Sequence, residues 1–147
     1  MSVCGGTNSC KHAAQAKRVK ILLVDDSAKV REMIKSLLAG LGVEFTECSD
    51  GCEALAAYRA GQPDWVLMDI LMPTMDGLTA TRQITAACPQ ARVVVLTQFE
   101  SEQLRAAAHD AGAYAYVLKE NVLQVRQLIE AQAGVHIVSA NQQKTGD

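Results

Sequence analysis

The chain has 147 residues, of which 49% are hydrophobic and 20% are charged, a composition typical of one globular domain with a hydrophobic core. Its 14 basic and 16 acidic side chains give a formal net charge of -2, which excludes the strongly basic surface that binds nucleic acid or anionic membranes. No apolar run approaches the roughly 20 residues that span a bilayer, and the N-terminus lacks the apolar stretch of a secretory signal. We therefore expect a cytoplasmic protein that binds neither nucleic acid nor membranes directly.

The N-terminal segment differs in composition from the rest of the chain. Residues 1–18 are polar and rich in small side chains, so we expect a flexible extension. Cys4, Cys10 and His12 could suggest a metal cluster, but three ligands without the paired spacing of zinc sites weigh against one. The five cysteines are odd in number and scattered, so we expect reduced thiols. The remainder is predicted to form one folded domain and a C-terminal tail, at residues 19–133 and 134–147.

The first half of the chain predicts two strands, each followed by a helix. The run Lys20–Val24 is apolar and stops at two aspartates, which is typical of a strand covered on both faces. From Ser27, a candidate N-cap, apolar residues recur at helical spacing up to the glycines at 40 and 42. A strand over Val43–Cys48 then precedes a helix over Asp50–Gly61, which starts with a capping-box pattern.

The second half predicts three further strands, each again followed by a helix. The strands are apolar throughout and the helices carry apolar residues along one face. The predicted strands are Trp65–Met68, Arg92–Leu96 and Tyr114–Leu118. The predicted helices are Thr74–Cys88, Ser101–Ala111 and Asn121–Ala133.

Five repeats of strand then helix, with uniformly apolar strands, predict an α/β fold. The sheet should be parallel and covered by helices on both faces, because a strand buried on both sides has no polar alternation. We therefore predict a doubly wound five-stranded parallel sheet. Ligands of such sheets bind outside the carboxyl ends of the strands, where the strand order reverses.

Chemically useful side chains follow four of the five predicted strands. Asp25 and Asp26 follow the first strand, Asp69 the third, Thr97 the fourth and Lys119 the fifth. Three carboxylates in one crevice repel each other and favour a hard cation such as Mg²⁺ among them. A lysine adds a fixed charge for an anion, and a threonine hydroxyl can donate to a phosphoryl oxygen. One such aspartate alone is more often a helix cap or turn former, but the set indicates phosphoryl transfer to an aspartate nucleophile.

Four motifs in the chain resemble, in order and spacing, the receiver domain of two-component response regulators (CheY-like). They are VDDS at 24–27, LMDILMPTMDG at 67–77, VVLT at 94–97 and YVLK at 116–119. The resemblance covers about residues 20–133 and implies a receiver domain with the flavodoxin/CheY-like strand order 2-1-3-4-5. The segments around the last two motifs look closest to receivers that precede LuxR-type DNA-binding domains.

The resemblance also implies how the site works. Asp69 would accept a phosphoryl group from a sensor histidine kinase or a histidine phosphotransfer protein. Asp26 and Asp69 would bind Mg²⁺ by carboxylate and Leu71 by its backbone carbonyl, while Asp25 would act mainly through water. Lys119 would hold a phosphoryl oxygen. Such a domain is not an enzyme in the usual sense, because it catalyses only its own phosphorylation and dephosphorylation.

Two further residues are implied to form a switch. Thr97 would swing to bond the phosphoryl group, and Tyr116 would turn inward behind it. The result would be a changed surface that binds a downstream protein partner, acts on a fused output domain or forms a homodimer on phosphorylation.

Three other functions remain as alternatives. A haloacid-dehalogenase-like phosphatase would carry a D-x-D motif on the first strand, whereas Asp25 and Asp26 are adjacent. A flavodoxin-like cofactor site would have a first loop rich in Ser, Thr and Gly, whereas the loop with Asp25 and Asp26 is acidic and would repel a phosphate. A degenerate receiver would bind partners without phosphorylation, against which the intact set of Asp26, Asp69, Thr97 and Lys119 argues.

Overall fold

A computed structural model of the protein describes residues 18–132. The predicted N-terminal extension with Cys4, Cys10 and His12, and the predicted C-terminal tail, lie outside the described residues. Within the described part, the cysteines at 48, 52 and 88 are free thiols, as expected. No helix in this part is long and apolar enough to cross a membrane.

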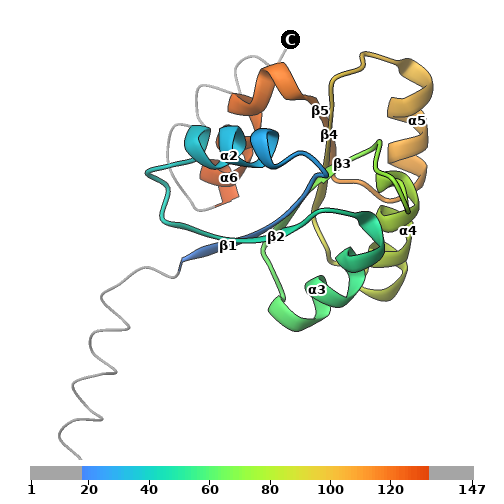
Figure 1. The fold of residues 1–147 in the computed structure, drawn as a ribbon, viewed down its shortest axis with the longest axis horizontal. Coiled ribbons are helices and arrows are strands. Elements are labelled where there is room, and N and C mark those ends of the chain that lie inside the picture. Colours follow the sequence, from blue (N-terminus) through green and yellow to red (C-terminus); the bar gives the residue numbers. More distant parts are fainter. Residues whose placement is uncertain (1–17, 133–147) are drawn as a thin grey trace, which may run out of the picture.

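Five strands form one parallel sheet in the order β2-β1-β3-β4-β5 (Figure 1). The strands are β1 (Val19–Val24), β2 (Val43–Cys48), β3 (Trp65–Asp69), β4 (Val93–Thr97) and β5 (Ala115–Leu118). The helices are α2 (Ala28–Leu37), α3 (Ala54–Gly61), α4 (Gly77–Ala87), α5 (Glu102–Asp110) and α6 (Val122–Gln132). Short 3-10 turns, η1 (Gly51–Glu53) and η2 (Lys119–Asn121), precede α3 and α6. The predicted fold and its strand order are confirmed.

The sheet lies between two layers of helices (Figure 1). Helices α2 and α6 pack on one face, and α3, α4 and α5 cover the other. Successive residues of β1 alternate between the two layers: Ile21 and Leu23 face the first, and Leu22 and Val24 face the second. Every residue of β3 and β4 is buried, which explains why these strands read as continuous apolar runs.

Helix α4 begins three residues later than the predicted start at Thr74. The N–H groups of Thr74 and Met75 donate to the Asp50 carboxylate, at 2.8 and 3.0 Å, so these residues belong to the loop after β3. Asp76 is the actual N-cap, because its side chain accepts the N–H of Thr79 at 2.8 Å. A contact with a residue distant in the sequence therefore displaces the helix start.

Gly77 marks a close approach between this loop and the end of β3. Its N–H donates to the carbonyl of Ile70 at 2.8 Å, and a Cβ at this position would overlap the carbonyl oxygen of Asp69. No side chain larger than hydrogen fits there without displacing the backbone of the strand that carries Asp69.

Replacing Gly77→Ala should lower the free energy of unfolding by roughly 1–3 kcal/mol, as overpacking of a rigid site does. Urea unfolding followed by circular dichroism measures this. The matched control is Gly61→Ala in α3, where a Cβ meets nothing within 4 Å and the change should be neutral or stabilising. Equal losses in both variants would contradict the proposed overlap.

Candidate functional site

Three carboxylates meet at the carboxyl ends of two neighbouring strands. Strands β1 and β3 pair with Val24 opposite Met68, so Asp25 and Asp69 leave the sheet side by side. One carboxylate oxygen from each of Asp25, Asp26 and Asp69 lies within 4.8 Å of the others. Asp25 and Asp69 are buried, whereas Asp26 is exposed. The convergence predicted from the strand ends is present.

Lys119, directly after β5, bridges two of these carboxylates. Its Nζ lies 2.9 Å from Oδ2 of Asp25 and 3.1 Å from Oδ1 of Asp69. Burial alone would lower the pKa of Lys119, but the hydrogen bond to Asp25 and the charge of Asp69 outweigh it and raise the pKa. The lysine is therefore held in its charged form between two anions.

The surroundings of Asp69 oppose its negative charge. Burial, and after it the charge of Asp25, raise the pKa of Asp69 even though Lys119 is in contact with it. Lys119 therefore does not fully offset the cost of burying this charge beside Asp25, and a further cation at the site would be favourable. Among the described residues, three hard carboxylate oxygens form this cluster without a histidine or cysteine, and such a ligand set suits Mg²⁺.

The three aspartates differ in the partners that they already have. Oδ1 of Asp25 accepts the N–H of Ser27 at 2.9 Å, and its Oδ2 accepts Lys119. The side chain of Asp26 makes no hydrogen bond or ion pair within the described part of the chain. Asp25 thus offers fewer open lone pairs to a ligand than Asp26 or Asp69 does.

Thr97 and Tyr116, the two predicted switch residues, hold the same neighbour. Oγ1 of Thr97 accepts the N–H of Phe99 at 3.1 Å, and the Tyr116 hydroxyl donates to the carbonyl of Phe99 at 2.7 Å. Thr97 is buried at the end of β4, and the half-buried Tyr116 ring lies 4.5 Å below the Arg105 guanidinium. The backbone of Phe99 therefore links the two side chains in the β4–α5 loop.

The loop after β3 carries Leu71 and depends on a residue that sequence reasoning missed. Leu71 follows Asp69 by two positions, with its side chain exposed. The buried Asp50 accepts the backbone N–H groups of Thr74 and Met75 in this loop and of Cys52 beside it. These hydrogen bonds lower the pKa of Asp50 to about 2. The sequence marked Asp50 only as a helix start, because no local signal shows a contact 24 residues away.

The comparisons with known proteins agree with this geometry. The family model described as "Response regulator receiver domain" matches residues 21–132. The chain belongs to this family. The match favours a receiver of two-component signalling over the phosphatase and the flavodoxin-like alternatives.

Two curated relatives illustrate the family. The chain is 37% identical over 113 residues to chemotaxis protein CheY of Bacillus subtilis (strain 168), covering 76% of this chain and 92% of CheY. It is 38% identical over 106 residues to response regulator MprA of Mycobacterium sp. (strain KMS), covering 72% of this chain and 46% of MprA. The chain thus matches nearly all of CheY but only about half the length of MprA.

Two solved structures share the fold. A LuxR-family two-component response regulator from Aurantimonas sp. SI85-9A1 superposes with a TM-score of 0.73 at 35% identity, covering 80% of this chain and 87% of that one. The CheX-CheY-BeF3-Mg+2 complex from Borrelia burgdorferi superposes with a TM-score of 0.68 at 29% identity, covering 75% of this chain and 87% of that one. The first of these bears out the predicted likeness to receivers of LuxR-type regulators.

The Asp50 carboxylate makes stability depend on pH. Its pKa is about 2 in the folded protein and about 3.9 in an unfolded chain, so its ionised form stabilises the fold above about pH 4. That contribution is lost as the pH falls from about 4 to about 2. Asp50→Asn should therefore lower the urea midpoint at neutral pH, and its deficit relative to the unmodified protein should shrink below about pH 4.

Urea titrations at several pH values measure this difference. The control is Asp110→Asn, a change at an exposed position of α5, whose midpoint should follow that of the unmodified protein at each pH. A deficit of Asp50→Asn that stays constant down to about pH 2 would contradict the assigned pKa.

Proposed function

We propose that Asp69 is the phosphoacceptor of this receiver. The observation that carries the proposal is the placement of Asp69: it is buried at the end of β3, against Lys119, with its charge opposed by its surroundings. Oδ1 of Asp69 contacts Lys119, and the described residues give no hydrogen bond to Oδ2. A carboxylate with one oxygen anchored and the other open is suited to act as a nucleophile.

In the proposed reaction, a carboxylate oxygen of Asp69 attacks the phosphorus of a phosphohistidine. The new O–P bond forms as the N–P bond breaks, and the released imidazole takes up a proton. The donor is a sensor histidine kinase or a histidine phosphotransfer protein in the cytoplasm. The domain catalyses only this transfer and the later hydrolysis of its own acyl phosphate.

The acidic cluster is proposed to hold Mg²⁺ during this transfer. Asp26 and Asp69 would bind by carboxylate and Leu71 by its carbonyl, and Asp25 would act through water because both of its oxygens already have partners. The ion would neutralise negative charge on the cluster and the phosphoryl oxygens. The Borrelia CheY structure, named as a complex with BeF3 and Mg+2, supports this assignment.

Lys119 and Thr97 are proposed to respond to the added phosphoryl group. Lys119, already between Asp25 and Asp69, would hold one phosphoryl oxygen. If the Thr97 hydroxyl turns to donate to another phosphoryl oxygen, it releases the N–H of Phe99. The β4–α5 loop then loses one of the two side-chain hydrogen bonds that hold the Phe99 backbone. Tyr116 would then settle inward, and the face formed by α5, β5 and α6 would change for a downstream partner, a fused output domain or a second copy.

Replacing Asp69→Asn should abolish phosphorylation, because an amide oxygen is a far poorer nucleophile than a carboxylate. The measurement is the intact mass after incubation with acetyl phosphate and Mg²⁺. The control is Asp76→Asn, which changes a carboxylate in the same loop while asparagine still serves as the N-cap of α4. If Asp69→Asn gains the phosphoryl group as fast as the control does, the phosphoacceptor has been assigned wrongly.

Magnesium should raise the melting temperature, since it binds the folded site and relieves the repulsion there. A concentration of about ten times Kd corresponds to roughly 1.4 kcal/mol of added stability, which is a shift of a few degrees for a domain of this size. Asp26→Asn should reduce the shift while leaving the buried Asp25–Lys119–Asp69 contacts intact. If millimolar magnesium causes no shift in the unmodified protein, the proposed metal site is wrong.

A further inference from the structure

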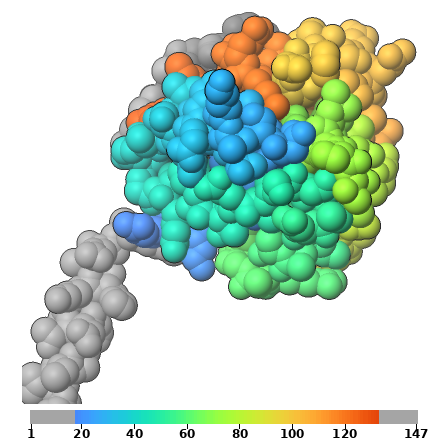
Figure 2. Space-filling view, in the orientation of Figure 1, coloured from blue at the N-terminus to red at the C-terminus, as the bar shows by residue number. Residues whose placement is uncertain are grey.

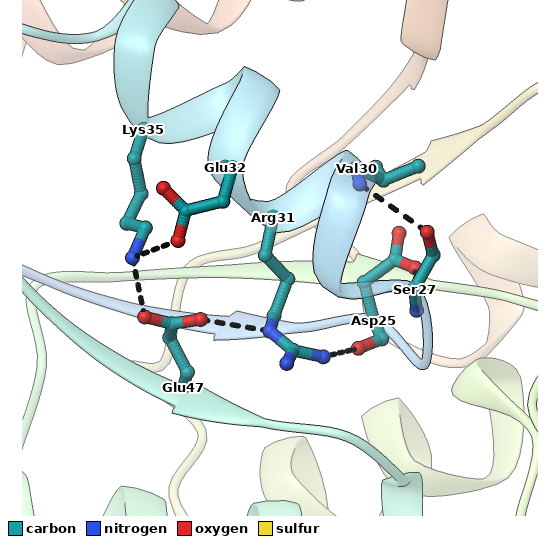
Figure 3. A network of polar contacts seen from close by, with 7 residues as sticks. All are labelled: Asp25, Ser27, Val30, Arg31, Glu32, Lys35 and Glu47. Atoms are coloured by element: carbon teal, nitrogen blue, oxygen red, sulfur yellow. Dashed lines mark hydrogen bonds and ion pairs between the residues drawn. The ribbon is translucent and has the colours of Figure 1, made fainter.

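Arg31 connects the acidic loop after β1 to the edge strand of the sheet. One guanidinium nitrogen, Nη1, donates to the backbone carbonyl of Asp25 at 2.5 Å. Nε of the same side chain donates to Oε1 of Glu47 on β2 at 2.7 Å (Figure 3). Figure 2 shows the blue atoms of α2 packed against the teal segment that contains β2, so this bridge spans two elements that touch. Arg31 is therefore held at both ends.

The Asp25 carbonyl that accepts from Arg31 restricts the backbone of the next residue, Asp26. The carbonyl of Asp25 and the N–H of Asp26 belong to one planar peptide group, so fixing the carbonyl restricts the backbone from which the Asp26 carboxylate extends. Asp25 itself is held at other points as well. Its N–H donates to the carbonyl of Cys48, and its carboxylate accepts the N–H of Ser27 and contacts Nζ of Lys119. Within residues 18–132, the exposed Asp26 has no such side-chain contacts, so the direction of its carboxylate depends on this peptide.

Glu47 is itself held between two cations. Its Oε2 lies 2.6 Å from Nζ of Lys35, which also contacts Glu32 at 2.9 Å (Figure 3). The hydrogen bonds from Lys35 and then Arg31 lower the pKa of Glu47, so its carboxylate is ionised at neutral pH. An ionised carboxylate with both oxygens engaged gives Arg31 a fixed anchor.

We propose that Arg31, oriented by Glu47, is a positioning residue that directs the Asp26 carboxylate toward the magnesium site. This inference rests on the proposed function, and it adds to the site two residues that contact neither the metal nor the phosphoryl group. Outer residues that orient metal ligands commonly affect metal affinity by about 10–100-fold.

Charge alone predicts the opposite result for Arg31. A guanidinium close to a cation site repels the cation, so removing the positive charge would strengthen magnesium binding if electrostatics were its main effect. A positioning role predicts weaker binding. Arg31→Lys separates the two, because lysine keeps the charge but its single ammonium lacks the planar fork that reaches Glu47 and the Asp25 carbonyl together.

The test compares Arg31→Lys, Glu47→Gln and the control Glu32→Gln with the unmodified protein. Glu32→Gln removes the same charge from the same network as Glu47→Gln, but among the described residues the Glu32 carboxylate pairs only with Lys35. Calorimetry gives the Kd for Mg²⁺ alone, and melting in EDTA gives the stability without metal. Intact mass after acetyl phosphate gives the phosphorylation rate at saturating Mg²⁺.

Arg31→Lys and Glu47→Gln should each weaken Mg²⁺ binding by about tenfold, while Glu32→Gln should stay within about twofold. A variant that combines Arg31→Lys with Glu47→Gln should bind Mg²⁺ no more weakly than Arg31→Lys alone, because both changes break the same Glu47–Arg31 bridge. The phosphorylation rate should recover in both variants when Mg²⁺ is raised in proportion to its Kd.

A purely structural role would give a different pattern: lower melting temperatures in EDTA with an unchanged Kd for Mg²⁺. That result, or a weakening by Glu32→Gln equal to that by Glu47→Gln, overturns this inference. Failure of the unmodified protein to bind Mg²⁺ or to gain a phosphoryl group overturns the proposed function as well. If the unmodified protein does both and the variants match the control, only the positioning role is wrong.

Discussion

Electrostatic repulsion at one edge of the sheet is the constraint on which the site depends. The pairing of β1 with β3 fixes Asp25 and Asp69 side by side, and Asp26 adds a third carboxylate within 4.8 Å. The strands cannot separate, because their other residues form the buried core. Lys119 offsets part of the repulsion, yet burial and then the charge of Asp25 still raise the pKa of Asp69. This uncompensated negative charge makes the edge receptive to a cation.

Strand β2 supports this edge without contributing a carboxylate to it. Glu47, near the end of β2, anchors Arg31, which holds the loop after β1. Asp50, just beyond β2, holds the loop after β3 through the N–H groups of Thr74 and Met75. The two loops that carry the acidic cluster are thus fixed from the same side. Sites held in this way need little rearrangement to bind a ligand.

The sequence was most informative where the chemistry is local. Apolar runs that end in Asp25, Asp69, Thr97 and Lys119 predicted both the parallel sheet and the residues that meet at its edge, because parallel strands bring their carboxyl ends together. The start of α4 was predicted too early, since the spacing of apolar residues does not reveal that Asp50 captures the preceding loop.

Contacts across the fold were beyond the reach of sequence reasoning. The bridge from Glu47 through Arg31 to the carbonyl of Asp25 joins a strand, a helix and a loop. The shared hold of Thr97 and Tyr116 on the Phe99 backbone is likewise visible only when β4 and β5 are paired. Both sets of contacts join residues that are distant in the sequence, which the spacing of residues does not reveal. The first set bears on the position of the acidic cluster, and the second on the link between Thr97 and Tyr116.

The central claim is that Asp69 carries the phosphoryl group, and chemical trapping tests it most directly. Borohydride reduces an aspartyl phosphate to the alcohol, homoserine, and leaves free carboxylates unchanged. The protein would be phosphorylated in the presence of Mg²⁺, reduced, digested and mapped by tandem mass spectrometry. The account predicts homoserine at position 69 alone. Homoserine at position 25 or 26, or a phosphorylated protein that yields none at position 69, would contradict it.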